Sequence, residues 1–305
     1  MTLKSHFSDT IEANSLTSSA DRGHISPVIR LIYTSQLVSV GIFRCRPWHD
    51  LFHEDGRAKA HMLVFPRTSV YIQHEHQQPL VANPNLIMFY NRDQVYQRRK
   101  LSERGDMCEF FVFDEGVIRQ AAGRIAPQWT EFERPFPFTH GFSDSQVYLQ
   151  QRQIVNHILR GAALDEVYIQ ETLMHILANA LDNVGRVDDR RPGKRHPHTR
   201  KAHAELVYEA QSMLTTEYRN ALSIEKLADS LHVSPYHLCR VFRRETGLTI
   251  HRYLNQLRMH SSLERISRPD EEISRVALDL GYASHSHFTQ TFNRTFGLTP
   301  SALRV

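Results

Sequence analysis

Short apolar runs alternate with polar turns along the chain before residue 144. Runs rich in Val, Ile, Phe and Tyr lie at residues 37–45, 61–65, 69–73, 86–90 and 108–113. These residue types favour extended backbone, and runs of this length are typical of strands rather than of helices. The pattern predicts strands of an antiparallel sheet or small barrel, and we expect an antiparallel β-barrel within residues 1–143.

The period of the apolar positions changes between residues 144 and 184. Apolar residues now recur at helical spacing, at positions Val147, Ile154, Ile158, Leu173, Ile176 and Leu177. This spacing predicts two amphipathic helices, divided near Gly161. Because the helices present apolar stripes, we expect residues 144–184 to form a homodimer interface, with Leu173, Ile176 and Leu177 in it.

Residues 185–201 differ in composition from the segments on either side. They contain seven Lys or Arg, two Asp, two prolines and almost no apolar side chain. Such a segment has nothing with which to build a core. We therefore interpret residues 185–202 as a basic, flexible linker.

Residues 203–305 are patterned as helices with clear start and stop signals. Ser223 and Ser234 stand where a side chain can cap a helix, and Pro235 suits a first helical position. Gly247 follows the second of these helices, at a place where a left-handed residue is needed. The pattern predicts a helix, a tight turn and a second helix.

The same outline recurs about fifty residues later. The stretch SPYHLCRVFRRETGLT, from Ser234, matches SHSHFTQTFNRTFGLT, from Ser284, at the capping, core and glycine positions. A predicted helix over residues 250–266 joins the copies and would hold them at a fixed separation. In each copy the apolar residues share one side of the helix, so the opposite, polar side is left for a partner.

A helix of this diameter fits the major groove of duplex DNA, where Arg binds guanine and Gln or Asn binds adenine. The polar side is basic and aromatic in the first unit, and neutral and rich in amides in the second. The candidate DNA-binding residues are Tyr236, Cys239, Arg240 and Arg243, with His285, Ser286, Thr289, Gln290 and Asn293. Arg268 and Arg294 are candidates for phosphate contacts.

This repeated pattern resembles the DNA-binding domain of the AraC/XylS family of transcriptional regulators, most closely over residues 277–304. The resemblance implies that both units contact DNA. It also implies base contacts from Tyr236, Cys239 and Arg240 in the first unit, and from Ser286, Thr289 and Gln290 in the second. Cys239 and Gln290 depart from the residues that are frequent there, so the bases cannot be copied from relatives. Residues 81–97 resemble, more loosely, the cupin-type sensor barrels of the same family.

Composition is that of a globular protein, with 41% hydrophobic and 23% charged residues. The formal net charge of +4 suits a polyanionic partner without identifying one. The three cysteines are far apart in the sequence, which argues against a disulfide framework and leaves no CxxC metal pair. Since no run approaches the length of a membrane span and the start lacks a secretion signal, we expect a cytoplasmic protein without a membrane partner.

The predicted fold class is α+β, with an N-terminal cupin-like barrel, dimerisation helices, a basic linker and a C-terminal all-α double helix-turn-helix domain. We expect a regulator, not an enzyme, that binds double-stranded operator DNA as a homodimer and takes a small organic effector, with RNA polymerase as a further candidate partner. We expect no cofactor. One alternative is an effector-independent regulator whose barrel only mediates assembly.

A second alternative is a metal-dependent cupin enzyme tethered to a DNA-binding module, because His74 and His76 alternate along a strand. No glutamate follows them at cupin spacing, so we expect no metal. If the effector carries a carboxylate, Arg44, Arg67 or His74 is the expected anchor in a mostly apolar pocket.

Overall fold

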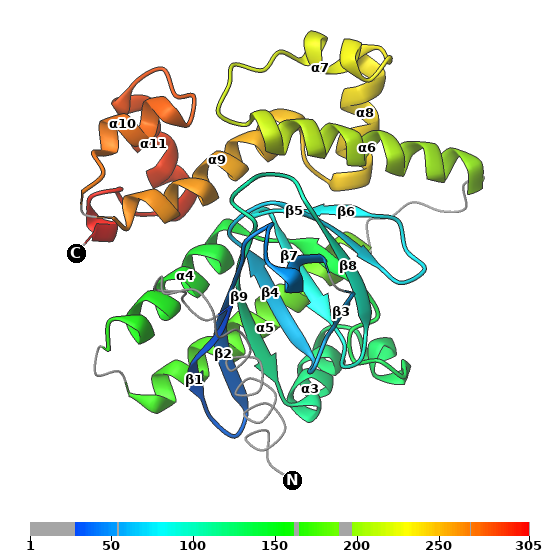
Figure 1. Ribbon diagram of the computed structural model, residues 1–305, viewed down its shortest axis with the longest axis vertical. Helices are drawn as coiled ribbons and strands as arrows, with labels where there is room; N and C mark the ends of the chain where they lie inside the picture. Colours follow the sequence, from blue (N-terminus) through cyan, green and yellow to red (C-terminus); the bar gives the residue numbers. More distant parts are fainter. Residues whose placement is uncertain (1–27, 54, 162–164, 189–196, 269, 305) are drawn as a thin grey trace. The chain divides into compact units, whose positions relative to one another are not determined.

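The computed structural model describes residues 28–53, 55–161, 165–188, 197–268 and 270–304 (Figure 1). The chain divides into two compact units. The N-terminal unit runs to residue 185 without residues 83–85 and 144–149, which cluster with the C-terminal unit from residue 186 onward. Within the described ranges, no helix is long and apolar enough to cross a membrane.

The N-terminal unit contains two antiparallel sheets. The larger has the strand order β1-β2-β9-β4-β7-β10. Its strands are β1 (Ile29–Thr34), β2 (Val38–Cys45), β9 (Asp106–Phe113), β4 (Met62–Pro66), β7 (Leu86–Tyr90) and β10 (His140–Phe142). The smaller has the order β3-β8-β5-β6, with β3 (Gly56–Arg57), β8 (Val95–Lys100), β5 (Val70–His74) and β6 (Leu80–Ala82). The five predicted apolar strands are confirmed as β2, β4, β5, β7 and β9.

The prediction of a closed barrel is wrong, because no strand of one sheet pairs with a strand of the other. Closure requires the edge strands to pair along their length. The edges of the smaller sheet, β3 and β6, have only two and three residues. At the crossing from β4 to β5, the backbone N–H groups of Arg67 and Thr68 both donate to the Met107 carbonyl instead of starting a new ladder. The unit is therefore a sandwich.

Strand β9 shows how the sequence divides its side chains between two environments. Cys108, Phe110 and Val112 belong to the apolar cluster between the sheets. Since neighbouring residues of a strand face opposite ways, Glu109 and Phe111 point to the other side of the larger sheet. There Glu109 meets Arg152 of helix α4 (Ser145–Leu159), so this face is covered by helix.

Two helices follow the sheets, α4 and α5 (Glu166–Asp188), with Gly161 between them in the left-handed conformation. This confirms the predicted pair and its division. Leu173, Ile176 and Leu177 are at most 1% exposed, because they pack inside the N-terminal unit itself. The prediction that these three residues face a second copy is therefore wrong, since the stripe serves the unit's own core.

Shorter helices complete the N-terminal unit: α2 (Asp50–His53), α3 (Glu115–Ile125) and the 3-10 turn η1 (Pro127–Glu131). The prediction of a flexible linker over residues 185–202 is wrong at both ends, where residues 185–188 and 197–202 are helical, and residues 189–196 lie outside the described residues. Helix α5 extends to Asp188 from one side of this gap. Helix α6 (Pro197–Glu217) begins on the other.

The C-terminal unit is helical in its described residues. After α6 come α7 (Ile224–Ser230), α8 (Pro235–Thr246), α9 (Ile250–Ile266), α10 (Ile273–Asp279), α11 (His285–Phe296) and the 3-10 turn η2 (Ala302–Arg304). The Ser234 and Ser284 hydroxyls accept the backbone N–H groups of His237 and His287, each at 3.2 Å. Gly247 and Gly297 end their helices with φ of 74° and 76°. The predicted caps of both repeats are confirmed.

The two turns are built alike up to one inserted residue. His232 in the first turn and Gly281 in the second have positive φ, four residues after Ala228 and Ala277, respectively. The next residue in each turn, Val233 or Tyr282, donates its N–H to the carbonyl of that alanine. The extra residue of the second unit is therefore Ala283, immediately before the Ser284 cap.

Candidate nucleic-acid interface and ligand cavity

Helix α8 separates its side chains into a buried and an exposed face. Leu238 and Phe242 are fully buried, as their helical spacing predicts. Tyr236 is 77% exposed although it is a large aromatic residue, and Arg240 and Arg243 are exposed on the same helix. An exposed aromatic residue beside two cations is the composition expected of a surface that meets DNA.

No residue in the described part of the chain neutralises the charges on this face. Arg240 and Arg243 form no ion pair with another described residue. Arg244, one position further on, instead contacts Glu245 at 3.0 Å and is turned toward α6. The two exposed guanidinium groups are therefore available to phosphates or base edges.

Helix α11 repeats the division, and its predicted base-contact residues are uncharged. Phe288 and Phe292 are fully buried. The exposed candidates are His285, Ser286, Gln290 and Asn293. A neutral face with amide groups suits hydrogen bonding to base edges, and contributes little to the attraction of the DNA backbone.

Two predicted contact residues are only partly accessible. Cys239 is intermediate in burial. Thr289 is also intermediate, and its hydroxyl is buried without a hydrogen-bond partner among the described residues. The hydroxyl is thus turned away from solvent, which leaves the methyl group of Thr289 as the part that can meet a base, such as the methyl group of thymine.

Arg258 of α9 joins the two helix-turn-helix units, and the sequence analysis missed it. Its Nε donates to the Tyr218 carbonyl at 2.6 Å and its Nη2 to the Asn220 carbonyl at 2.9 Å, before α7. Its Nη1 donates to the Gly281 carbonyl at 3.3 Å, in the turn of the second unit, and its guanidinium lies 5.8 Å from the Tyr282 ring. In the sequence Arg258 is one of several polar residues on a helix, so no local signal marks it.

The two arginines predicted to bind phosphates differ in their surroundings. Arg268 contacts Glu264 at 3.5 Å and Glu271 at 3.6 Å. Arg294 is exposed on α11 and has no ion pair among the described residues. Of the two, Arg294 is the better placed for a phosphate, because Arg268 would first have to leave its carboxylates.

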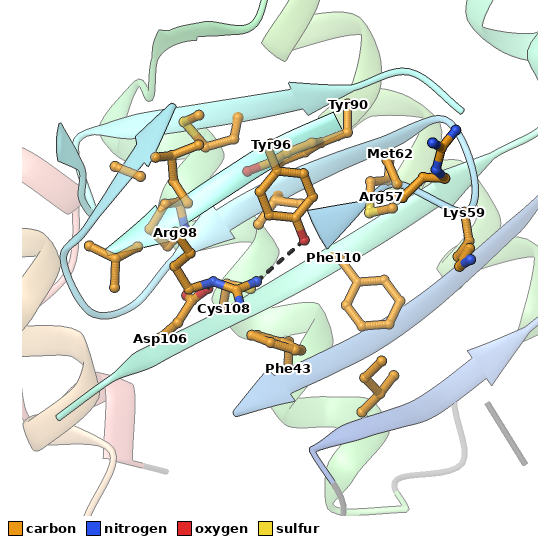
Figure 2. Close-up of a pocket in the computed structure, with 18 residues that line it drawn as sticks. Phe43, Arg57, Lys59, Met62, Tyr90, Tyr96, Arg98, Asp106, Cys108 and Phe110 are labelled. Carbon is orange, nitrogen blue, oxygen red and sulfur yellow. Dashed lines mark hydrogen bonds and ion pairs between the residues drawn. The ribbon is translucent and has the colours of Figure 1, made fainter. Parts of the chain in front are cut away.

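A cavity of about 140 Å³ lies between the two sheets of the N-terminal unit (Figure 2). Most of its wall is apolar or aromatic, and includes Phe43, Val70, Ile72, Met88 and Phe110. These residues come from strands of both sheets. The cavity is therefore a space that the facing sides of the two sheets leave unfilled.

One end of the cavity is lined by a buried ion pair, so it carries no net charge. Arg98 Nε lies 2.6 Å from an Asp106 carboxylate oxygen, and both side chains are less than 10% exposed. Arg98 also donates to the Tyr96 hydroxyl at 3.3 Å, as Figure 2 shows. Burial by itself lowers the pKa of Arg98, but Asp106 and the nearby tyrosines raise that pKa above its ordinary value. Arg98 therefore stays charged, with Asp106 as its counter-ion.

The other end of the cavity carries cations without partners. Arg57 and Lys59 line the cavity and are exposed, and neither has a hydrogen bond or ion pair with another described residue. Figure 2 shows both side chains at the end of the cavity opposite the Arg98–Asp106 pair. Arg57 ends β3 and Lys59 lies in the bend that follows, so both come from one short segment of the chain.

The three side chains predicted as anchors do not line this cavity. Arg67 is held by Glu109 at 2.9 Å, and Arg44 is exposed elsewhere. The His74 Nδ1 lies 3.0 Å from the Gln94 amide nitrogen, and burial lowers the pKa of His74 to about 4.

Arg44 is adjacent to the cavity residue Phe43 on β2, so strand alternation points it the opposite way. His74 is on the cavity side of β5, but its ring packs against Tyr90 and Tyr96, with centroid distances of 5.1 and 6.3 Å, and does not line the cavity. The expectation that these three side chains anchor a ligand in this cavity is therefore wrong.

The His74 and His76 pair does not form a metal site. His74 is 1% exposed at the end of β5, whereas the His76 side chain is 91% exposed in a turn with positive φ. Throughout the described ranges, no group of three His, Cys, Asp or Glu is arranged to hold a metal ion. His74 and His76 are therefore not directed at one common ion.

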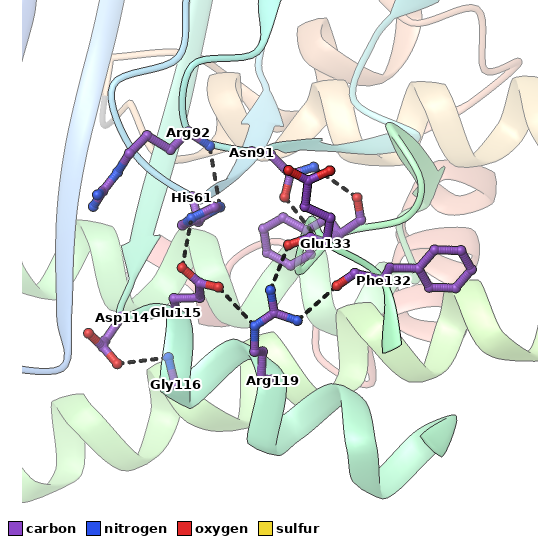
Figure 3. Close-up of polar contacts among 10 residues, drawn as sticks. His61, Asn91, Arg92, Asp114, Glu115, Gly116, Arg119, Phe132 and Glu133 are labelled. Carbon is purple, nitrogen blue, oxygen red and sulfur yellow. Dashed lines mark hydrogen bonds and ion pairs between the residues drawn. The ribbon is translucent and has the colours of Figure 1, made fainter. Parts of the chain in front are cut away.

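A third polar cluster, around His61, is internally satisfied (Figure 3). His61 Nε2 lies 3.5 Å from Glu115, and Glu115 accepts a 2.8 Å hydrogen bond from Arg119. Arg119 also donates to the carbonyls of Phe132 and Glu133, at 3.0 and 2.7 Å. The hydrogen bond from Arg119 lowers the pKa of Glu115. These contacts anchor the segment that follows α3.

A family model described as a helix-turn-helix domain matches residues 227–305. The chain is 33% identical over 96 residues to the bifunctional transcriptional activator/DNA repair enzyme AdaA of Bacillus subtilis, covering 30% of this chain and 46% of AdaA. It is 34% identical over 91 residues to the HTH-type transcriptional activator RhaS of Escherichia fergusonii, covering 30% of this chain and 33% of RhaS. The matches thus span less than half of these relatives.

Two solved structures are also similar. A transcriptional regulator from Chromobacterium violaceum, described by its AraC-type DNA-binding domain, is 25% identical, with a TM-score of 0.32. That match covers 34% of this chain and 93% of the other. ToxT of Vibrio cholerae is 10% identical, with a TM-score of 0.34, over 88% of this chain and 97% of ToxT.

Proposed function

We propose that the protein, whose residues 227–305 form an AraC-type helix-turn-helix domain, is a sequence-specific DNA-binding transcriptional regulator. The observation that carries this proposal is the exposed face of α8, where Arg240 and Arg243 have no counter-ion among the described residues. The amide-rich face of α11 is the second surface that we propose to contact bases. Two helices joined by α9 would address successive major grooves of one operator.

The N-terminal unit is the part of the protein that we propose to bind the effector. Its cavity between the sheets is enclosed mainly by apolar side chains and has polar groups at its ends, as is typical of small-molecule sites. A ligand changes DNA affinity only if it binds one state of the protein better than another. We therefore expect the coupling to be reciprocal, so that operator DNA changes the affinity for the effector by the same factor.

Assembly and location complete the proposal. We place the regulator in the cytoplasm as a homodimer, with RNA polymerase as a further partner. Val167 and Tyr168, near the start of α5, are 70% and 53% exposed and are the apolar residues there that a second copy could cover. A dimer would present two double helix-turn-helix domains to one operator.

The proposal is tested by selecting bound DNA from a random pool with the full-length protein. The selected site should hold two conserved blocks about ten base pairs apart, one turn of the duplex. Arg240→Ala should cost about 1–3 kcal/mol on that site and relax one base position. Arg124→Ala, which removes an exposed cation of α3, is the matched control and should leave binding unchanged.

Two results would contradict the assignment. One is a selected pool with no common sequence, which would mean that the domain binds DNA only through its charge. The other is an equal loss of affinity for random DNA and for the selected site on Arg240→Ala. That loss would make Arg240 a phosphate contact rather than a reader of bases.

A further inference from the structure

We propose that the cavity between the sheets binds a small organic carboxylate, with its apolar body among Phe43, Tyr96 and Phe110 and its carboxylate held by Arg57 and Lys59. This inference rests on the proposed function, because it assigns a chemical class to the effector of the N-terminal unit.

Size limits the ligand to a compact body. The cavity measures about 140 Å³. An apolar protein cavity of about 150 Å³ is large enough for benzene and stays free of water when nothing polar lines it. The body of the ligand is therefore about as large as one six-membered ring or a short branched chain. A sugar ring with several hydroxyl groups is disfavoured, because few wall residues could hydrogen-bond those groups.

The wall favours an apolar body over a polar one. Phe43 and Phe110 lie on neighbouring strands of the larger sheet, and Tyr90 and Tyr96 contribute rings with a centroid distance of 4.9 Å. The Tyr96 hydroxyl already accepts a hydrogen bond from Arg98. Aromatic walls of this kind pack best against a flat or branched hydrocarbon surface.

Charge sets the orientation of the ligand. At one end, the positive charge of Arg98 is matched by Asp106, so this end has no net charge to offer. At the other end, Arg57 and Lys59 supply two positive charges without a carboxylate partner among the described residues. A carboxylate can accept hydrogen bonds from both an Arg fork and a Lys ammonium, and it adds little volume to a small apolar body.

The backbone holds these two cations in place. Ala58, between them, is 3% exposed, and its N–H donates to the Gln94 carbonyl at 3.0 Å. Its own carbonyl accepts the N–H of Asp93 at 2.7 Å. With Ala58 pinned by two hydrogen bonds, Arg57 and Lys59 start from a defined position at the mouth of the cavity. Less conformational freedom is then lost on binding.

The test uses the full-length protein and acid–amide pairs of equal shape: benzoate with benzamide, and isovalerate with isovaleramide. Calorimetry should show that wild-type protein binds at least one acid, and binds its amide about tenfold more weakly or worse. Affinity for the acid should fall as salt is added, because the cations are exposed. Arg57→Gln with Lys59→Gln should remove the preference for the acid.

Arg44→Gln is the matched control, since it removes an exposed cation that does not line the cavity and should keep the preference. Both cations are exposed, so the double variant is expected to fold, and circular dichroism checks this. The inference is overturned if acid and amide bind equally, if the double variant binds the acid like wild type, or if neither acid binds at millimolar concentration.

Operator binding separates this inference from the proposed function. Suppose that an acid binds through Arg57 and Lys59 but leaves the affinity for selected DNA unchanged. The ligand site would then stand, and regulation through it would be wrong. Suppose instead that the protein binds its operator and no member of the panel. The DNA-binding function would stand, and the carboxylate inference would be wrong.

Discussion

Replacing Arg258 with alanine should loosen the connection between the two helix-turn-helix units, whose helices α8 and α11 we propose to contact DNA. The side chain makes hydrogen bonds to three backbone carbonyls, at 2.6, 2.9 and 3.3 Å. Two of the carbonyls belong to Tyr218 and Asn220, before α7, and the third to Gly281 in the second turn. In the Arg258→Ala variant, α9 would still run through both units, but no side chain would bridge these segments.

The expected loss in the free energy of unfolding follows from the number and exposure of these hydrogen bonds. A hydrogen bond from a charged donor contributes about 1.5–3 kcal/mol when it is buried. The bonds to Asn220 and Gly281 are exposed, and water can replace the donor there, so each counts for much less. The part-buried bond to Tyr218 contributes most. We therefore expect Arg258→Ala to lower the free energy of unfolding by about 2 kcal/mol.

The effect on DNA recognition should appear in the spacing between the two operator blocks. A change of one base pair rotates one block by roughly 35° relative to the other. Wild-type protein should discriminate against such sites, whereas Arg258→Ala should bind the native spacing more weakly and the altered spacings almost equally well. Arg258→Lys should not rescue the preference, because one ammonium cannot reach three carbonyls in the geometry of a guanidinium.

Band-shift titrations on operators with spacing changed by one base pair measure this effect, and urea unfolding measures stability. Arg252→Ala is the control, since it removes an exposed cation of the same helix and should weaken all spacings alike. If Arg258→Ala kept the full spacing preference of wild type, the bridge would have no role in recognition. An unchanged free energy of unfolding would also refute the estimate of bond strength.

Three further predictions concern stability. Glu109→Gln should cost about 3–5 kcal/mol in urea unfolding, because Glu109 is the buried partner of two arginines, and an additional Arg152→Met should recover part of the loss. Burial lowers the pKa of His74 to about 4, so its contribution is complete above about pH 6.5 and lost toward pH 4. Unfolding at several pH values should show a weaker acid dependence in His74→Gln. Gly281→Ala should destabilise more than Gly247→Ala in thermal melts, since only at Gly281 would the new Cβ meet a backbone carbonyl oxygen, at 2.7 Å.

The confirmed predictions rest on signals that lie within a few residues of each other. A serine cap acts on a backbone N–H three residues later, and a glycine ends a helix by its own φ. This is why Ser234, Ser284, Gly247 and Gly297 are all found in the predicted roles. The apolar strands were predicted for the same reason. Strand β8, VYQRRK, was missed because its outward residues are charged, and β3 and β6 are too short to show a period.

The corrections concern relations between distant residues. Whether a sheet closes depends on how far its edge strands run beside each other, and the apolar period is the same in a barrel and in a sandwich. The sequence alone does not distinguish the roles of Arg44, Arg67 and Arg57. Only pairing in space shows that Arg67 belongs to Glu109, 42 positions away, while Arg57 faces the cavity.

The sequence by itself determined the longer apolar strands, the capped helices and the polar faces of α8 and α11, because periodicity and capping act through neighbouring residues. Tertiary structure alone decided that the sheets form a sandwich with a cavity, that Leu173, Ile176 and Leu177 serve the unit's own core, and that Arg258 bridges the two helix-turn-helix units. These outcomes depend on which of many similar side chains meet across the fold. Burial and charge pairing select among those contacts only when the whole chain is packed.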